Sequence, residues 1–130
     1  EGMPHLMVAG DVAHVARRVT DFLKREAKKD LVTAVALHAG RLGARPASMS
    51  LKDTKSRWGS CSAQGALAFS WRVILAPPSV LDYLAAHEVA HLREMNHSPR
   101  FWRLVRETCP GSEAARHWLK HYGARLHAFG

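Results

Sequence analysis

The chain has 130 residues, of which 47% are hydrophobic, so it is long enough for one core and is not a disordered sequence. No run of about 18 apolar residues occurs and no basic segment precedes an apolar one at the start, so we expect neither a membrane span nor a secretory signal. Two cysteines are too few for a disulfide framework, which favours a cytoplasmic protein.

The net charge of +8 favours a polyanionic partner. Because the sequence holds no base-reading motif, the expected interaction is weak, sequence-independent binding to DNA. The alternative is a basic surface that serves only solubility, since Lys and Arg are spread along the whole chain.

The first predicted element is one long helix over residues 11–42. Apolar side chains recur through it with a period close to about 3.6 residues. Asp11 is a suitable N-cap residue, and Gly40 and Gly43 suit the C-terminal end.

Two strands are predicted next, over residues 47–54 and 66–75. The first alternates apolar with polar residues, and the second is rich in aromatic and β-branched residues. The segment between them, 55–65, has turn glycines at Gly59 and Gly65 and is expected to be a loop. Two strands joined in this way suggest an antiparallel ribbon.

A mostly buried helix is predicted in "PPSVLDYLAAHEVAHLREMN", residues 77–96. Ser79 can cap its start, with Asp82 three residues later, much like a capping box, and Asn96 is a plausible terminator. A further helix is expected to begin with Ser98 as N-cap and a proline in the first helical position. A last helix is predicted over about residues 112–127.

The stretch "HEVAHLREMNH", residues 87–97, predicts a metal site. His87 and His91 are four residues apart and lie on one helical face. Glu88 is turned by about 100° from His87, so its carboxylate can reach a metal-bound water without being a ligand. A catalytic zinc takes three protein ligands and leaves one position for water. If the helix ends before His97, the chain can turn back and bring this third histidine to the ion.

The alternative is that a chain with nine histidines has this spacing by accident. Three polar side chains in the middle of an apolar helix are costly to bury without a partner, which favours a metal. His117 and His121 form a second pair at the same spacing but without a glutamate, and we interpret them as a solvated helix face. The remaining histidines have no spacing relation and are interpreted as ordinary residues: His5, His14, His38 and His127.

Three blocks carry a family resemblance: "TKSRWGSCS" at 54–62, "FSWRVILAPPSVLDYLAAHEVAHL" at 69–92 and "NHSPRFW" at 96–102. Through them the chain resembles the YgjP-like zinc metallopeptidases, a family related to the WLM and SprT-type proteases. The resemblance implies an α+β, zincin-like fold, in which a small antiparallel sheet packs with a long N-terminal helix, a central active-site helix and C-terminal helices. It also implies that residues 1–130 are one metallopeptidase domain, the catalytic part of a longer chain.

The resemblance further implies one zinc ion per chain, with His87, His91 and His97 as ligands and Glu88 as the catalytic base. Metzincins share the histidine spacing but have glycine where Glu94 stands here, and the sequence has no Met-turn, so we do not place the chain among them. In gluzincins the third ligand is a downstream glutamate, and the candidates for that role here are Glu107 and Glu113.

The segment "KSRWGSC" has two interpretations. Arg57 or Lys55 lines the cleft and meets substrate carbonyls or an anionic group, or else Trp58 is a core anchor and Cys61 a small buried residue. Phe101 and Trp102 are expected in the core. The residue that stabilises the oxyanion is left open among five candidates: Arg57, Tyr83, His117, His121 and Tyr122.

The leading hypothesis is a zinc-dependent peptidase that hydrolyses peptide bonds of a protein or peptide substrate. Zinc would lower the pKa of a bound water toward about 7, and Glu88 would take its proton. One alternative is a zinc-stabilised, nucleic-acid-associated binding module, which would not need a carboxylate beside the metal. Another is a protease that acts on DNA-bound proteins.

Overall fold

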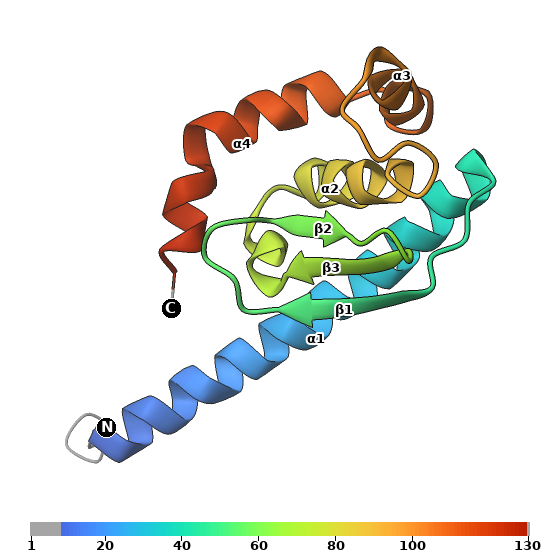
Figure 1. Ribbon diagram of the computed structural model, residues 1–130. Helices are drawn as coiled ribbons and strands as arrows, with labels where there is room; N and C mark the ends of the chain where they lie inside the picture. Colours follow the sequence, from blue (N-terminus) through green and yellow to red (C-terminus); the bar gives the residue numbers. More distant parts are fainter. Residues whose placement is uncertain (1–8, 130) are drawn as a thin grey trace.

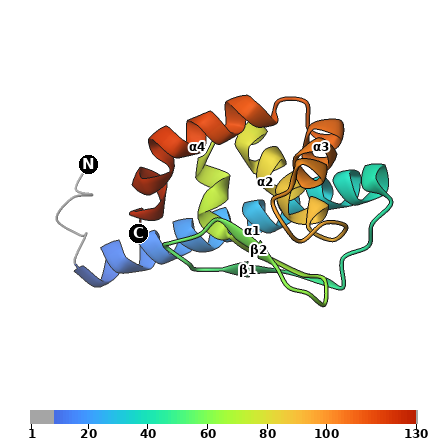
Figure 2. The ribbon, with the colours of Figure 1, turned by 45° about the horizontal axis from the view of Figure 1, so that its top comes forward.

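The computed structural model describes residues 9–129 of the chain. The three strands form one sheet on one side of the molecule, and the helices pack on the other side (Figure 2). The α+β fold class expected from the sequence is confirmed. In chain order the elements are α1 (Ala9–Leu42), β1 (Ser48–Lys52), β2 (Gly59–Cys61), β3 (Ala66–Ser70), the 3-10 helix η2 (Trp71–Leu75), α2 (Pro78–Ala90), α3 (Pro99–Thr108) and α4 (Ser112–His127) (Figure 1).

Helix α1 has an exposed N-terminal part and a buried C-terminal part. Residues 11–22 project beyond the sheet (Figure 1), whereas Leu31 is fully buried. The helix begins at Ala9, so the predicted N-cap Asp11 lies inside the first turn, and that prediction is wrong. Just after the helix, Gly43 has a φ of +62°, a left-handed conformation that glycine adopts readily.

The sheet is mixed, which corrects the predicted antiparallel ribbon. Its strand order is β1-β3-β2, with β1 parallel and β2 antiparallel to β3. The segment 55–65, expected to be a loop, contains the short strand β2. Gly65, with a φ of +88°, and Ser62 form the turn that reverses the chain after β2, where the Gly65 amide donates to the Ser62 carbonyl at 2.9 Å. This hairpin makes β3 antiparallel to β2, and the other edge of β3 pairs with β1 in the parallel direction.

The predicted strand over residues 66–75 is wrong in its second half. It ends at Ser70, whose hydroxyl accepts a hydrogen bond from the amide of Arg72 at 3.3 Å and caps the 3-10 helix η2. The Arg72 side chain is buried. Its guanidinium donates to Asp53 Oδ1 at 2.5 Å and to the Phe129 carbonyl at 2.7 Å. It therefore connects the loop after β1 with Phe129, just after the end of α4.

Helix α2 is central and mostly buried, as expected. It packs against α1, α3, α4 and β2. Its start differs from the prediction, because Pro77 is the N-cap residue and Pro78 the first helical residue, and Ser79 makes no capping hydrogen bond. It ends at Ala90, so the predicted end near Asn96 is also wrong.

The last two helices agree with the sequence. The Ser98 hydroxyl accepts a hydrogen bond from the amide of Phe101 at 3.3 Å, so Ser98 caps α3 and Pro99 begins it. Helix α4 spans Ser112–His127, as predicted. Within residues 9–129, no helix is long and apolar enough to cross a membrane.

Candidate metal centre and active site

Three histidines converge at the C-terminal end of α2. His87 and His91 are one turn apart on this helix, and His97 comes from the segment between α2 and α3. One ring nitrogen from each lies within 4.8 Å of those from the other two, and the Nε2 atoms of His91 and His97 are 3.1 Å apart. This convergence is possible because α2 ends at Ala90. The turn that follows reverses the chain and brings His97 back beside the end of the helix.

Neighbouring groups fix the orientation of two of these rings. His91 Nδ1 donates to the carbonyl oxygen of Glu94 at 3.1 Å, which leaves the lone pair on its Nε2 facing His97. The Tyr83 hydroxyl lies 3.1 Å from His87 Nδ1. Such contacts on the far nitrogen are how metal-binding histidines are held in the correct tautomer.

The surroundings also keep the imidazoles of His87 and His91 neutral. Burial, together with the neighbouring His91 and His97, lowers the pKa of His87 to about 3. Burial also lowers the pKa of His91. A neutral imidazole is the form that binds a metal ion, so His87 and His91 are in the binding form at neutral pH.

Glu88 lies beside this cluster with its side chain buried. Burial raises its pKa to about 7, while the charge of Arg57 acts in the opposite direction. Gly59 of β2 packs directly on the carboxylate, since a Cβ atom at this position would lie 3.0 Å from Glu88 Oε2. The sequence predicts Gly59 only as a turn residue, and no sequence signal shows this close approach.

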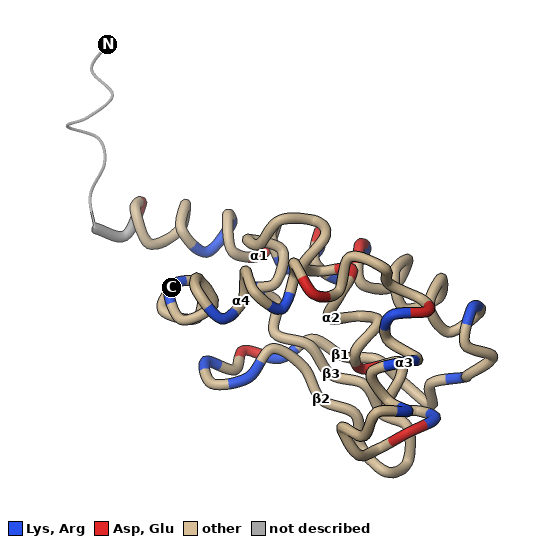
Figure 3. The backbone as a smooth tube through the Cα atoms, turned by 90° about the horizontal axis from the view of Figure 1, so that it is seen from above, with Lys and Arg blue, Asp and Glu red and all other residues tan. Residues whose placement is uncertain are grey.

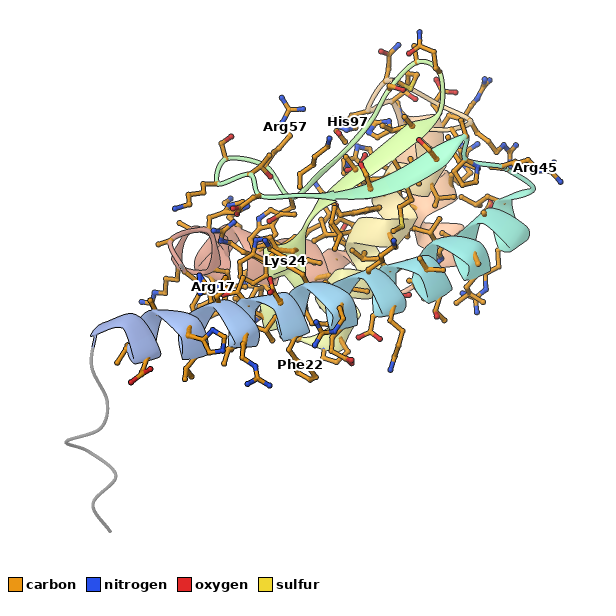
Figure 4. The ribbon with its side chains drawn as sticks, turned by 90° about the horizontal axis from the view of Figure 1, so that it is seen from below. Arg17, Phe22, Lys24, Arg45, Arg57 and His97 are labelled. Carbon is orange, nitrogen blue, oxygen red and sulfur yellow. The ribbon has the colours of Figure 1, made fainter. Side chains whose placement is uncertain are left out.

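The three histidines, Glu88 and residues of β2 line a hollow of about 300 Å³. Arg57 lies on the side of the molecule where His97 lies (Figure 4). Ser60 and Met95 also line the hollow, and the sequence analysis did not propose a role for either. The lining consists of Arg57, Gly59, Ser60, Cys61, His87, Glu88, His91, Met95 and His97. Of the two residues proposed to line the cleft, Arg57 is therefore at the site.

Two of the aromatic residues near the site, Phe101 and Trp102, contact the histidine cluster, and a third, Trp58, does not line the hollow. The Phe101 ring is fully buried, as expected, and stacks on His91 with 4.4 Å between ring centroids. The half-buried Trp102 lies against His97 with 5.6 Å between centroids. Trp58 does not line the hollow but stacks on His127 at 3.8 Å, which supports its interpretation as an anchor.

The other oxyanion candidates lie outside the hollow. Tyr83 contacts the far nitrogen of His87, and Tyr122 is exposed on α4. His117 and His121 are exposed on the same helix, where His121 Nδ1 donates to the His117 carbonyl at 3.0 Å. Neither Glu107 nor Glu113 belongs to the one cluster of three or more metal-ligand side chains found within residues 9–129.

The histidines without a spacing relation differ from one another in burial and in contacts. His14 is exposed, and His5 lies outside the described residues. His38 is fully buried, with Nδ1 2.5 Å from Thr108 Oγ1 and Nε2 2.8 Å from Asp82 Oδ1. It links α1, α2 and α3, so its role is structural and the sequence analysis missed it.

Comparison with known proteins agrees with this geometry. The family model described as the YgjP-like metallopeptidase domain matches residues 3–122. The chain belongs to the YgjP-like metallopeptidase family. Its activity class is therefore peptide hydrolysis with the help of a metal, as the sequence resemblance implied. No curated protein matches the chain.

A solved structure matches the fold of this metallopeptidase. It is the crystal structure of the metallopeptidase zymogen of Pyrococcus abyssi abylysin, with a TM-score of 0.62 and 23% sequence identity. The match covers 74% of the present chain and 94% of that chain. At this identity the likeness concerns the fold, and it is consistent with the expected zincin-like architecture.

Proposed function

We propose that this metallopeptidase binds one zinc ion through His87, His91 and His97 and hydrolyses peptide bonds with Glu88 as the general base. The observation that carries the proposal is the convergence of three imidazole nitrogens within 4.8 Å beside a buried carboxylate. No fourth His, Cys, Asp or Glu joins the cluster within residues 9–129. A structural zinc site has four protein ligands, so three ligands and a neighbouring carboxylate favour a catalytic site.

The three side chains fit zinc in donor type and in spacing. Imidazole nitrogens are common zinc ligands. Two nitrogens that are both about 2.1 Å from one ion at a tetrahedral angle lie about 3.4 Å apart. The 3.1 Å between the Nε2 atoms of His91 and His97 is close to that value, and the widest separation in the cluster, 4.8 Å, has to shorten by about 1.4 Å when the ion binds.

Bound zinc supplies a Lewis acid, which polarises a carbonyl group and lowers the pKa of a water molecule toward about 7. In the proposed mechanism the Glu88 carboxylate accepts a proton from the attacking water and passes it to the leaving amine. Gly59 keeps this carboxylate in place from the side of β2. Arg57 is the one oxyanion candidate that lines the hollow, and its guanidinium supplies positive charge there.

The substitution Glu88→Gln tests the proposed base. Glutamine has nearly the shape of glutamate but cannot accept the proton, so cleavage of casein should fall by about 10²–10⁴-fold. The zinc content, measured by elemental analysis, should not change. Glu107→Gln, an exposed position on α3, is the matched control. Equal cleavage by wild type and Glu88→Gln would show that the role assigned to Glu88 is wrong.

Association with nucleic acid is the second candidate, and it rests on charge. Lys and Arg are distributed over the whole chain, with Lys52, Lys55 and Arg57 grouped around the loop between β1 and β2 (Figure 3). We expect weak DNA binding whose affinity falls steeply with salt, as counterion release requires. A fluorescence titration of duplex DNA at several salt concentrations measures it, and absence of binding at low salt would leave solubility as the role of the charge.

A further inference from the structure

A second cleft lies beside the catalytic hollow, between α4 and the segment that leads into β2. Its volume is about 550 Å³. Helix α4 packs on α2 (Figure 1), and side chains from both helices line the cleft. The side chains that matter for its chemistry are Trp58, Tyr83, Glu113, Arg116, His117 and Lys120.

This cleft adjoins the proposed metal site. Tyr83 lines the cleft, and its hydroxyl contacts His87 Nδ1 at 3.1 Å. Trp58 lines it too, between two residues that line the catalytic hollow. The Arg116 guanidinium lies 3.9 Å from the ring centroid of Trp102, and that ring is 5.7 Å from the ring of His87. A peptide whose cleaved bond lies at the histidines therefore has a neighbouring side chain within reach of the cleft.

Positive charge dominates around this cleft. Arg116 and Lys120 line it, and Glu113 is its one acidic lining residue. The ion pair of Arg116 with Glu113 is 3.7 Å long, and the Glu113 side chain is 77% exposed, so solvent screens the pair. Lys55 and Arg57 come from the adjacent loop, where they line the two neighbouring hollows. Two cationic side chains thus line the cleft against one acidic side chain, and two more cationic side chains line the neighbouring hollows.

We propose that this cleft binds an acidic side chain of the substrate, next to the peptide bond that is cleaved. The proposal rests on the proposed peptidase function and names its substrate class. A guanidinium presents a planar set of N–H donors that matches a carboxylate, and Arg116 is positioned to use it. Trp58 and Tyr83 form the wall for the apolar part of the side chain. Because two cationic side chains, Arg116 and Lys120, line this cleft, which lies beside the catalytic centre, they fit a single peptide carboxylate better than a nucleic-acid backbone.

Binding to the zinc-loaded Glu88→Gln protein tests the proposal without cleavage. Two short fluorescein-labelled peptides, identical except for one Glu or Gln, are titrated at physiological salt and followed by fluorescence anisotropy. A hydrogen bond to a charged group predicts about tenfold tighter binding of the Glu peptide. Adding Arg116→Gln should remove this preference. Arg125→Gln is the matched control, because it removes the same charge from an exposed position of α4 that does not line the cleft.

Three results would overturn the proposal. The first is that the two peptides bind equally or that neither binds measurably. The second is that the Arg116→Gln and Arg125→Gln variants lose the preference for the Glu peptide to the same extent. The third is that a single-stranded oligothymidylate binds more tightly than the Glu peptide and that Arg116→Gln weakens this binding. That result would identify the cleft as a nucleic-acid site. Failure of the peptidase function has a different signature: wild-type protein would cleave neither peptide, while the Glu preference in binding would persist.

Discussion

At the scale of single residues, the position of the proposed base depends on the absence of one carbon atom. A Cβ atom on Gly59 would lie 3.0 Å from Glu88 Oε2 and 3.2 Å from the Ala68 carbonyl oxygen. These distances are shorter than an ordinary van der Waals contact, so the backbone or the buried carboxylate would have to shift by a few tenths of an ångström to make room for it. Gly59 therefore sets how closely β2 approaches α2, and through this the place of the carboxylate.

The substitution Gly59→Ala should move the carboxylate and leave the histidines in place. The added Cβ requires the carboxylate to shift by a few tenths of an ångström. A displacement of about 1 Å in a catalytic group lowers the rate by up to about 10²-fold, so for this smaller shift we expect kcat/KM to fall by about threefold to tenfold. Zinc content, measured by elemental analysis, should stay at the wild-type value. Gly40→Ala in α1 is the control, because nothing lies within 4 Å of its added Cβ. Unchanged kcat/KM in Gly59→Ala would contradict the positioning role.

These residues show which parts of the site the sequence could predict. The proximity of His87 and His91 follows from the helical repeat, which is local, and the structure brings His97 to the same point as expected. The contact of Gly59 with Glu88 joins two elements far apart in sequence, and no local pattern encodes it. The burial of His38 was missed for the same reason, since its partners lie on α2 and at the end of α3.

At the scale of elements, the helices were predicted better than the sheet. The helical period and the Ser98-Pro99 start are local signals, and both gave the correct element. Strand β2 has three residues, two of which are Gly and Ser, so its strand conformation depends on pairing with β3. The parallel pairing of β1 with β3 is likewise a tertiary property, which explains why the antiparallel prediction was wrong.

The 3-10 helix η2 shows how a polar side chain connects elements. The indole Nε1 of Trp71 donates to Asp53 Oδ1 at 3.0 Å, and the buried Arg72 donates to the same oxygen. The hydrogen bond from Trp71, which has the larger effect, and the one from Arg72 together hold the pKa of Asp53 below its usual value of 3.8. The loop after β1 is thereby fastened to η2.

This contact predicts a pH-dependent difference between wild type and Asp53→Asn. Since the folded-state pKa lies below the unfolded-state value, the ionised carboxylate stabilises the fold above about pH 4, and this contribution is lost as the pH falls through the folded-state pKa. The Asp53 side chain is 62% exposed, so we expect only about 1 kcal/mol at pH 7. Urea unfolding between pH 7 and pH 2 measures it, with Asp21→Asn on α1 as the control. A difference that stays constant over this range would contradict the assignment.

At the scale of the whole molecule, the fold surrounds one helix. Helix α2 is covered by α1, α3, α4 and β2, and its inner positions are fully buried: Ala85, Ala86, Val89 and Ala90. The polar side chains of His87, Glu88 and His91 lie where this cover opens into the hollow. Burying polar groups without partners is unfavourable, so a metal ion that binds the imidazoles would stabilise the folded state as well as serve catalysis.

Removal of zinc should therefore lower the melting temperature of the whole domain. A ligand that binds only the folded state stabilises it by about 4 kcal/mol when its concentration is 1,000 times its Kd, which corresponds to about 10 °C or more for a domain of this size. Differential scanning calorimetry with zinc and with a chelator measures this difference. His97→Ala, which removes an exposed side chain, should leave the melting temperature with chelator unchanged and abolish most of the increase that zinc causes. Glu88→Gln should keep that increase, because Glu88 is not a proposed ligand. An equal increase in wild type and His97→Ala would show that His97 does not bind the ion.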